Sequence, residues 1–254
     1  MRQERAGACG QASRIASYYR RRHSLGAEYQ GRPVGSFGDA EIFSLSPTKL
    51  AVAGEGGLVA VEDPELADHL RIGRDYGNGG DYDCRFAGLN ARMSEMHAIM
   101  ALAGLEALSV NIAGRRRAAR LYREGLQAVP GLTWQEVEDG SLSTFKDVAV
   151  IVEPEVFGAS RDATRWALDA EGVPTRTYFD PPAHRQKAYK GIAETAGALP
   201  QTQRLSANIL CLPIFSHIKD EQIEAVCDAI IKIHSHAAAI GAESVVGLRD
   251  KSIS

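Results

Sequence analysis

A lysine that follows one strand and precedes a glycine-rich turn constrains this chain more than any other feature. Glu41–Leu45 has the composition of a β-strand, and Lys49 follows it after three residues. The turn Gly54-Glu55-Gly56-Gly57 comes next, and Gly57–Val61 reads as the partner strand. The pattern predicts an α/β domain in which the lysine lies between two paired strands.

Composition excludes several classes of protein. The 254 residues suffice for one large α/β domain or two small ones, and 44% of them are hydrophobic. The net charge of −3 argues against a nucleic-acid-binding protein. The 4 cysteines fit no zinc pattern, so we expect reduced thiols in a cytoplasmic protein, with Cys227 on the core face of a helix. We see no transmembrane run and no secretory signal, and we expect no metal and no membrane partner.

Caps and periodicity predict the remaining elements. Asp63 and Pro64 open a helix whose buried face carries Leu66 and Leu70. Further helices are expected at 94–108, with its apolar stripe at Met96, Ile99, Met100 and Ala103, and at 112–126, 161–170 and 220–234. The arginines between 115 and 123 are interpreted as a solvated helix face. Strands are expected at 145–152, 173–177 and 209–212.

Lys49 is suited to covalent chemistry. A lysine amine can form a Schiff base with an aldehyde cofactor, and pyridoxal 5'-phosphate is the one most often held in this way. Ser44, at the end of the strand, is a suitable donor to the cofactor phosphate, and the glycine-rich turn allows the backbone to approach closely. The alternative on spacing alone is an ordinary surface lysine that follows a strand.

Several motifs in order resemble one family. They are 23–29 (HSLGAEY), 35–40 (GSFGDA), Phe43-Ser44-x-x-Pro47-Thr48-Lys49, 54–57 (GEGG) and 88–95 (GLNARMSE), with Leu-Pro pairs at 199–200 and 212–213. This order resembles the DegT/DnrJ/EryC1/StrS sugar-nucleotide aminotransferases, which use pyridoxal 5'-phosphate and have the transferase fold of type I. The resemblance implies transamination of a keto-sugar nucleotide with a glutamate-type donor, in aminosugar, polysaccharide or secondary-metabolite biosynthesis, by a homodimer.

The resemblance also implies roles for single residues. Lys49 falls on the lysine that bonds to the cofactor, and Ser44 falls on the phosphate-binding serine. His23 falls where relatives hydrogen-bond the phenolic oxygen of the cofactor. Asn90, with Arg92 beside it, falls where a residue reaches the cofactor phosphate of the neighbouring subunit. His184 falls in a loop that approaches the substrate.

Each of these roles has a structural alternative. His23 could be a plain strand-end histidine, and His184 a loop or core histidine. Asn90 could cap the helix that follows it. Tyr178 and Phe179 are interpreted as packing residues rather than as a stacking platform.

The beginning of the chain departs from the family pattern. Arg20 stands where relatives carry the aspartate that pairs with the pyridine nitrogen, and a guanidinium cannot accept that proton. We therefore expect the C-terminal part of a family member, truncated at its N-terminus. The expected fold is α/β, an incomplete large-domain sheet plus a small C-terminal α/β domain. The expected bounds are 1–22 for an atypical segment, 23–112 for the cofactor domain, 113–235 for the small domain and 236–254 for a tail.

Two functions stay open at this point. One is the family transamination. The other is a catalytically inactive remnant or a partner subunit, which the arginine at position 20 favours. A third, a dehydratase with the same cofactor, is disfavoured because such enzymes replace the lysine with histidine.

Overall fold

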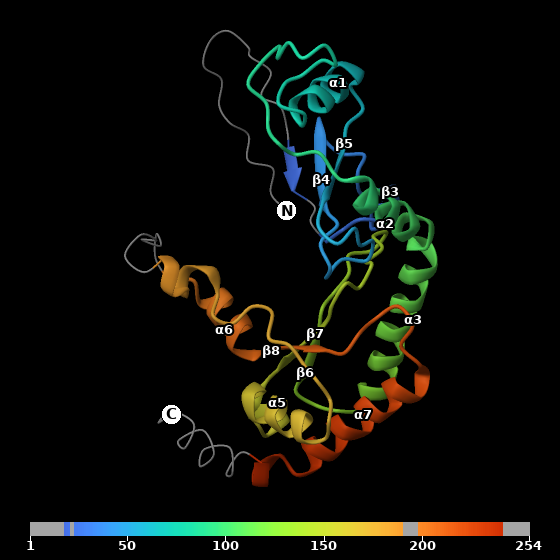
Figure 1. Ribbon diagram of the computed structural model, residues 1–254. Helices are drawn as coiled ribbons and strands as arrows, with labels where there is room; N and C mark the ends of the chain where they lie inside the picture. The colour runs from blue at the N-terminus through green and yellow to red at the C-terminus, as the bar shows by residue number, and fades with distance from the viewer. Residues whose placement is uncertain (1–17, 21–22, 190–197, 241–254) are drawn as a thin grey trace. The chain divides into compact units, whose positions relative to one another are not determined.

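The computed structural model describes residues 18–20, 23–189 and 198–240 of the chain. The chain divides into two compact units, Met1–Glu106 and Ala107–Ser254 (Figure 1). The predicted domain bounds, with a division between 112 and 113, remain an interpretation of the sequence. The predicted tail falls mostly outside the described residues. Residues 236–240 of this predicted tail are described. Ala237 among them is 5% exposed and packs with the core of the second unit.

The first unit contains a three-stranded sheet with the order β1-β4-β5. Its strands are β1 (Tyr18–Arg20), β4 (Ala40–Ser44) and β5 (Gly57–Ala60). β4 pairs in parallel with β1 and antiparallel with β5. A small antiparallel pair, β2 (Glu28–Tyr29) and β3 (Arg32–Pro33), lies between β1 and β4 in sequence. The predicted pair of strands around Lys49 is therefore present, and β4 joins the atypical N-terminal segment through β1.

Two helices complete the first unit, α1 (Pro64–Gly73) and α2 (Glu95–Glu106). The predicted cap of α1 is confirmed, because the Asp63 side chain accepts from the Glu65 N–H at 2.9 Å. The predicted buried face of α1 is wrong, because none of its residues is buried and Leu70 is 39% exposed. Capping is a local interaction, whereas burial requires another element to pack on the helix.

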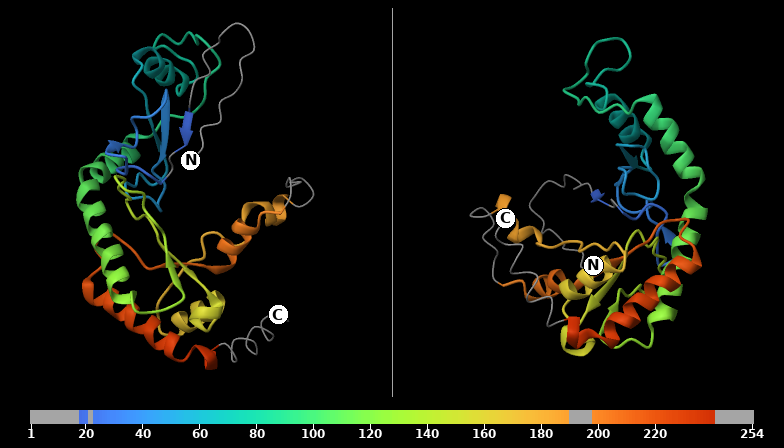
Figure 2. Two further views of the ribbon diagram at one scale, coloured as in Figure 1. Left: turned by 180° about the vertical axis from the view of Figure 1, so that it is seen from behind. Right: turned by 60° about the horizontal axis from the view of Figure 1, so that its bottom comes forward.

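The second unit is built on an antiparallel sheet with the order β6-β7-β8. Its elements in chain order are α3 (Leu108–Leu126), β6 (Leu132–Trp134), β7 (Val148–Val152), α4 (Pro154–Phe157), α5 (Arg161–Ala170), η1 (Ala183–Arg185), η2 (Lys187–Tyr189), α6 (Pro200–Asn208), β8 (Ile209–Leu212) and α7 (Asp220–Ser235). α3 and α7 lie side by side, and α5 packs on α7 (Figure 2).

One continuous core fills the second unit. Alternate residues of β7 are buried, as expected for an antiparallel sheet with one covered face. They pack with apolar side chains of α3, α5, β8 and α7, among them Tyr122, Leu168, Leu210 and Ile230. Cys227 is buried in this core, as predicted, whereas Ile231 of the predicted α7 stripe is 43% exposed.

A predicted strand and a predicted solvated helix face of the second unit are wrong. The segment 173–177 forms no strand; its one sheet-like contact is an isolated bridge between Arg176 and Cys211. The arginines of α3 are not all solvated. Arg115 donates to the Lys146 carbonyl at 2.9 Å, and Arg117 donates to the Ile218 carbonyl at 2.7 Å. These two side chains tie α3 to neighbouring loops, and burial lowers the pKa of Arg115, an effect that Asp147 partly offsets.

Candidate functional site

Lys49 lies in a loop whose two ends are joined at Leu45. The Leu45 N–H donates to the Gly56 carbonyl at 2.9 Å, and the Leu45 carbonyl accepts from the Ala53 N–H at 2.8 Å. Leu45 itself is 0% exposed, so its side chain anchors the loop in the first unit. Within the loop, the Lys49 N–H donates to the Ser46 carbonyl at 3.0 Å. The position of the lysine is therefore set by backbone hydrogen bonds on both sides.

Three hydroxyl groups lie along the same turn. The Ser44 and Ser46 Oγ atoms are 3.2 Å apart, and the Ser46 N–H lies 3.4 Å from Ser44 Oγ. Lys49 Nζ donates to Thr48 Oγ1 at 3.1 Å, and the lysine side chain is partly exposed. A partly exposed lysine and several hydroxyl groups on one turn are the groups that an aldehyde with a phosphate tail requires. The donor set at this turn thus fits the expected cofactor.

The glycine-rich turn is pressed against α2. A Cβ at Gly54 would lie 2.9 Å from the His97 ring, and a Cβ at Gly56 would lie 2.5 Å from the Met93 methyl group. His97 is fixed in turn, because its Nδ1 lies 2.7 Å from Ser94 Oγ. His97 was not among the residues predicted from the sequence. The serine three residues before it, at the start of a helix, is a local signal that could have found it.

A buried glutamate supports the strand that leads to Ser44. Glu41 is 0% exposed, and its Oε1 accepts from the N–H groups of Gly35 (2.9 Å) and Phe37 (2.7 Å). The neighbouring Ile42 is 42% exposed, which inverts the usual placement of charged and apolar residues. The sequence did not reveal this role, because it depends on how the loop directly before β4 folds back toward the strand. The glutamate holds the loop at 35–37 beside β4.

Asn90 and Arg92 lie in a segment that is bound to the end of α1. Asn90 forms an isolated bridge with Asp75, and Arg92 Nε lies 3.3 Å from Asp75 Oδ1. The alternative of a helix cap is wrong for Asn90, since α2 begins at Glu95 and the His97 N–H donates to Ser94 Oγ at 3.4 Å. Both predicted residues are exposed. Their role toward a neighbouring subunit stays a prediction.

The two other predicted site residues, His23 and His184, lie in different units of the chain. His23 is exposed in the turn before β2, and its predicted contact with a cofactor stays a prediction. His184 belongs to η1 of the second unit, and its Nε2 is buried without a hydrogen-bond partner among the described residues. A buried imidazole nitrogen normally has a partner, so the environment of this atom differs from that of an ordinary core histidine. Arg20 contributes backbone to β1, and its side chain lies outside the described residues.

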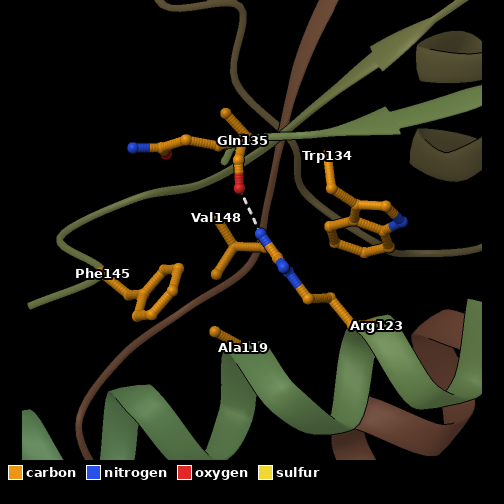
Figure 3. Close-up of a pocket in the computed structure, with 7 residues that line it drawn as sticks. Ala119, Arg123, Trp134, Gln135, Phe145 and Val148 are labelled. Carbon is orange, nitrogen blue, oxygen red and sulfur yellow. Dashed lines mark hydrogen bonds between the residues drawn. The ribbon is translucent and has the colours of Figure 1, made fainter. Parts of the chain in front are cut away.

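A small pocket in the second unit holds none of the predicted site residues (Figure 3). Its walls are mostly apolar, from α3, β6 and β7. Arg123 crosses it, donating to the Gln135 carbonyl, and its guanidinium lies 5.8 Å from the centre of the Trp134 ring. The single cation that lines the pocket is thus already paired within the unit. Among the described residues, no cluster of His, Cys, Asp and Glu could hold a metal ion.

The chain matches the model of the DegT/DnrJ/EryC1/StrS aminotransferase family over residues 22–231. It belongs to this family. The match begins just before His23 and includes Lys49, Ser44, Asn90, Arg92 and His184.

Within the described part of the chain, no single helix is long and apolar enough to cross a membrane; α2 and α3 pass on length and composition only when taken together.

Two relatives in the DegT/DnrJ/EryC1/StrS family are named as aminotransferases of sugar nucleotides. A UDP-N-acetyl-3-dehydro-alpha-D-glucosamine 3-aminotransferase of Acidithiobacillus ferrooxidans is 35% identical over 208 residues, 82% of this chain and 54% of the relative. A dTDP-3-amino-3,4,6-trideoxy-alpha-D-glucose transaminase of Streptomyces venezuelae is 35% identical over 81% of this chain and 53% of its own length. The chain thus spans about half the length of the curated relatives it matches.

Solved structures of the family share the fold. The crystal structure of DesI with its TDP-sugar product superposes with a TM-score of 0.81 and 35% identity, over 91% of this chain and 58% of that chain. The structure of DesV from S. venezuelae in complex with a ketimine intermediate gives a TM-score of 0.76 and 33% identity, over 82% and 55%. The α/β architecture described above is therefore that of family aminotransferases.

Proposed function

We propose that the protein takes part in the transfer of an amino group, from a glutamate-type donor to a keto-sugar nucleotide, with pyridoxal 5'-phosphate as cofactor. The turn that places Lys49 five residues after Ser44, with its Nζ beside the Thr48 hydroxyl, carries this proposal. It is supported by family membership and by relatives whose names specify dTDP- and UDP-sugars. The product would enter aminosugar, polysaccharide or secondary-metabolite biosynthesis in the cytoplasm.

Residues of the chain have distinct tasks in this proposal. When bound, the cofactor supplies an aldehyde and an electron-withdrawing ring that stabilises negative charge on the substrate carbon. Lys49 would hold the aldehyde and later carry a proton at Nζ. Ser44 would donate to the phosphate, since a hydroxyl at the end of β4 lies on the same turn as the lysine. His23 would bind the phenolic oxygen, and His184 would contact the sugar nucleotide.

Trapping of the cofactor on the lysine tests this proposal. The purified full chain is mixed with pyridoxal 5'-phosphate, reduced with borohydride and digested, and the labelled peptide is identified by mass spectrometry. We expect the label on Lys49 and its loss, with loss of the visible absorbance band, in Lys49→Ala. Lys187→Ala is the matched control, because Lys187 is exposed in the second unit. Equal labelling of several lysines, or none, would refute the proposal.

We further propose that the active form is a homodimer with Asn90 and Arg92 serving the neighbouring site. The outer face of α2 supports this, because Met96 (72%), Ile99 (62%) and Leu102 (62%) are exposed together. Its inner face instead carries Ala101 and Gly104, and Gly104 lies against the backbone of 51–52. Contiguous exposed apolar side chains mark interaction surfaces. The apolar stripe that the sequence predicted as the buried face of α2 therefore lies on its exposed face, with Met96, Ile99 and Met100 pointing outward.

Sedimentation of a charged variant tests the dimer. Ile99→Glu should yield monomers at concentrations at which the native chain sediments as a dimer. Val156→Glu, at an isolated exposed position in the second unit (59%), should leave the mass unchanged. A native chain that stays monomeric at all concentrations would contradict the dimer and leave the cofactor proposal standing.

A non-catalytic partner subunit is the second candidate. It is favoured by the small core of the first unit, in which Phe43 and Leu45 are the only buried apolar residues larger than alanine among those described. Such a unit could serve mainly to contact another chain. The trapping experiment separates the candidates, because a partner subunit without chemistry should show no preferential label on Lys49.

A further inference from the structure

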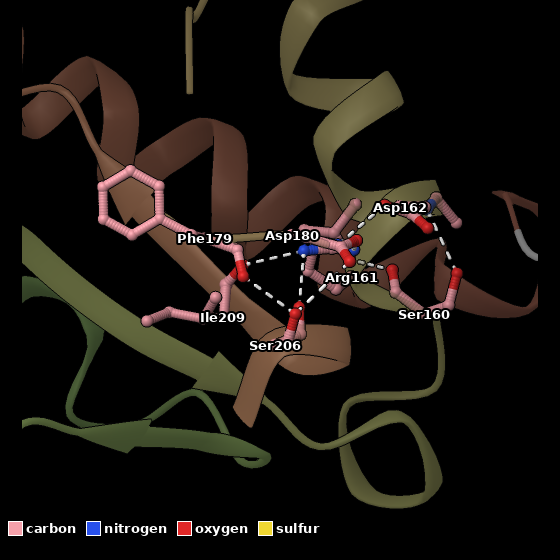
Figure 4. Close-up of polar contacts among 9 residues, drawn as sticks. Ser160, Arg161, Asp162, Phe179, Asp180, Ser206 and Ile209 are labelled. Carbon is pink, nitrogen blue, oxygen red and sulfur yellow. Dashed lines mark hydrogen bonds and ion pairs between the residues drawn. The ribbon is translucent and has the colours of Figure 1, made fainter. Parts of the chain in front are cut away.

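The segment that carries His184 is held by a buried guanidinium (Figure 4). Arg161 begins α5 and is 3% exposed. Its Nη2 donates to Asp180 Oδ2 at 2.6 Å, and its Nε lies 2.6 Å from Asp162 Oδ1. Its Nη1 lies 3.2 Å from one carbonyl of α6 and from one of β8. One side chain therefore joins three elements to the segment at 178–184.

Further contacts fix the same stretch of backbone. The Ser206 hydroxyl donates to the Phe179 carbonyl at 2.8 Å and lies 3.3 Å from Asp180 Oδ1. On the preceding residue, the Lys146 ammonium lies 5.0 Å from the centre of the Tyr178 ring. Three consecutive residues are thus bound through a side chain or a carbonyl. A loop held at so many points has a defined conformation before any ligand arrives.

Two side chains of this segment lie outside the polar cluster, and one of them, Phe179, has its ring centroid 5.0 Å from that of Tyr178. The Phe179 ring is 68% exposed and points away from the polar cluster (Figure 4), so its interpretation as a packing residue is wrong. Four residues after Asp180, His184 Nε2 is buried without a hydrogen-bond partner among the described residues. An exposed aromatic ring and an unpaired imidazole nitrogen on a fixed backbone are features of a ligand-binding segment.

We propose that Arg161 is a positioning residue, which acts through Asp180 and Ser206 to hold Phe179 and His184 ready for the sugar nucleotide. A guanidinium suits the task because its donors form a rigid fork that can serve carboxylates and carbonyls at once. A lysine at this position could not reach all four acceptors from a single ammonium. The nature of the ligand rests on the proposed function, whereas the positioning itself does not.

Two carboxylates on the same guanidinium provide a matched pair of variants. Asp180 lies on the positioned segment, whereas Asp162 lies on α5 beside Arg161 and is 59% exposed. In Asp180→Asn, hydrogen exchange of the amides at 178–185 should accelerate by about tenfold or more, since one charge-assisted hydrogen bond is lost. The ring resonances of His184 in NMR spectra should shift as well. Asp162→Asn should leave both within about twofold of the native chain.

Ligand binding gives the second readout. The dissociation constants of dTDP and of UDP for the native chain and the variants are measured separately by calorimetry. For whichever nucleotide the native chain binds, the dissociation constant should be about tenfold higher in Asp180→Asn. It should be unchanged in Asp162→Asn. Ser206→Ala, which keeps the ion pair, serves if Asp180→Asn does not fold; it should also accelerate exchange at 178–185. Unchanged exchange and His184 resonances in the folded Asp180 or Ser206 variant, or equal changes in the Asp162 variant, would overturn the positioning role.

The failure of the proposed function would look different. Exchange and NMR measurements need no cofactor, so they report the positioning even if no label appears on Lys49. A labelled lysine together with an unaffected segment would instead remove the positioning role alone.

Discussion

Removal of one hydroxyl from the core of the second unit gives a quantitative test of its packing. Tyr122 is 0% exposed, and its hydroxyl donates to the Pro213 carbonyl at 2.8 Å. Tyr122→Phe keeps the ring and deprives a buried carbonyl of its donor. A lost hydrogen bond costs about 0.5–1.5 kcal/mol, and an unsatisfied partner adds to this, so we expect a destabilisation of about 1–2 kcal/mol.

Urea unfolding followed by tryptophan fluorescence measures this loss in the second unit alone. The chain has 2 tryptophans, Trp134 and Trp166, and both lie in that unit. With a denaturant slope of about 2 kcal/mol per molar, the midpoint should fall by about 0.5–1 M urea. Tyr82→Phe is the control, because Tyr82 is 95% exposed and its change should stay below about 0.5 kcal/mol. Equal midpoints for the Tyr122 variant and the native chain would refute the reasoning.

The same tyrosine predicts a pH dependence. Burial, followed by the nearby Cys227, raises the pKa of Tyr122 above its ordinary value of 10.0. The folded state therefore favours the neutral phenol, and this contribution is complete below about pH 10 and declines as the pH rises further, because the unfolded chain ionises there. The stability gap between native chain and Tyr122→Phe should narrow above about pH 10. A gap that widens would show that the phenol is not buried as described.

Two further predictions use the same fluorescence assay. Burial raises the pKa of Cys227 from 9.0 to about 11. The free energy of unfolding that the neutral thiol contributes is therefore fully present below about pH 9 and should decline between about pH 9 and 11. The Cys227→Ala variant should show a flatter decline over this range. Gly131 and Gly172 both have positive φ (+79° and +77°), but only at Gly131 would a Cβ meet backbone, 2.4 Å from the Phe157 nitrogen. Gly172→Ala should cost about 1–2 kcal/mol and Gly131→Ala clearly more; equal costs would contradict the close approach.

Elements with local signals were predictable from the sequence. The N-cap Asp63 and the helix at 161–170 were predicted correctly, and the strand at 209–212 matches β8. In each case the residues within the element determine the outcome, through a cap, a helical period or a run of apolar residues. The family motifs also single out Ser44 and Lys49, which lie five positions apart in sequence, and their roles toward a cofactor stay predictions.

Features that depend on distant partners were not predictable. The segment at 173–177 has the composition of a strand, yet only Arg176 bridges to a neighbour. The stripe of α2 was assigned to the wrong face, because small residues at 101 and 104 permit the close approach to 51–52. Sequence periodicity records which residues are apolar and does not reveal which face another segment covers.

The distribution of buried side chains has a consequence for the lysine. The continuous core lies in the second unit, whereas the turn around Lys49 is held mainly by backbone hydrogen bonds at Leu45 and by contacts of His97 and Met93 with the glycine-rich turn. A ligand or second subunit that binds only the folded form of such a unit stabilises it by mass action, by about 2.7 kcal/mol at a hundredfold excess over Kd. If the proposed cofactor binds at Lys49, its binding and the order of the first unit would therefore favour each other.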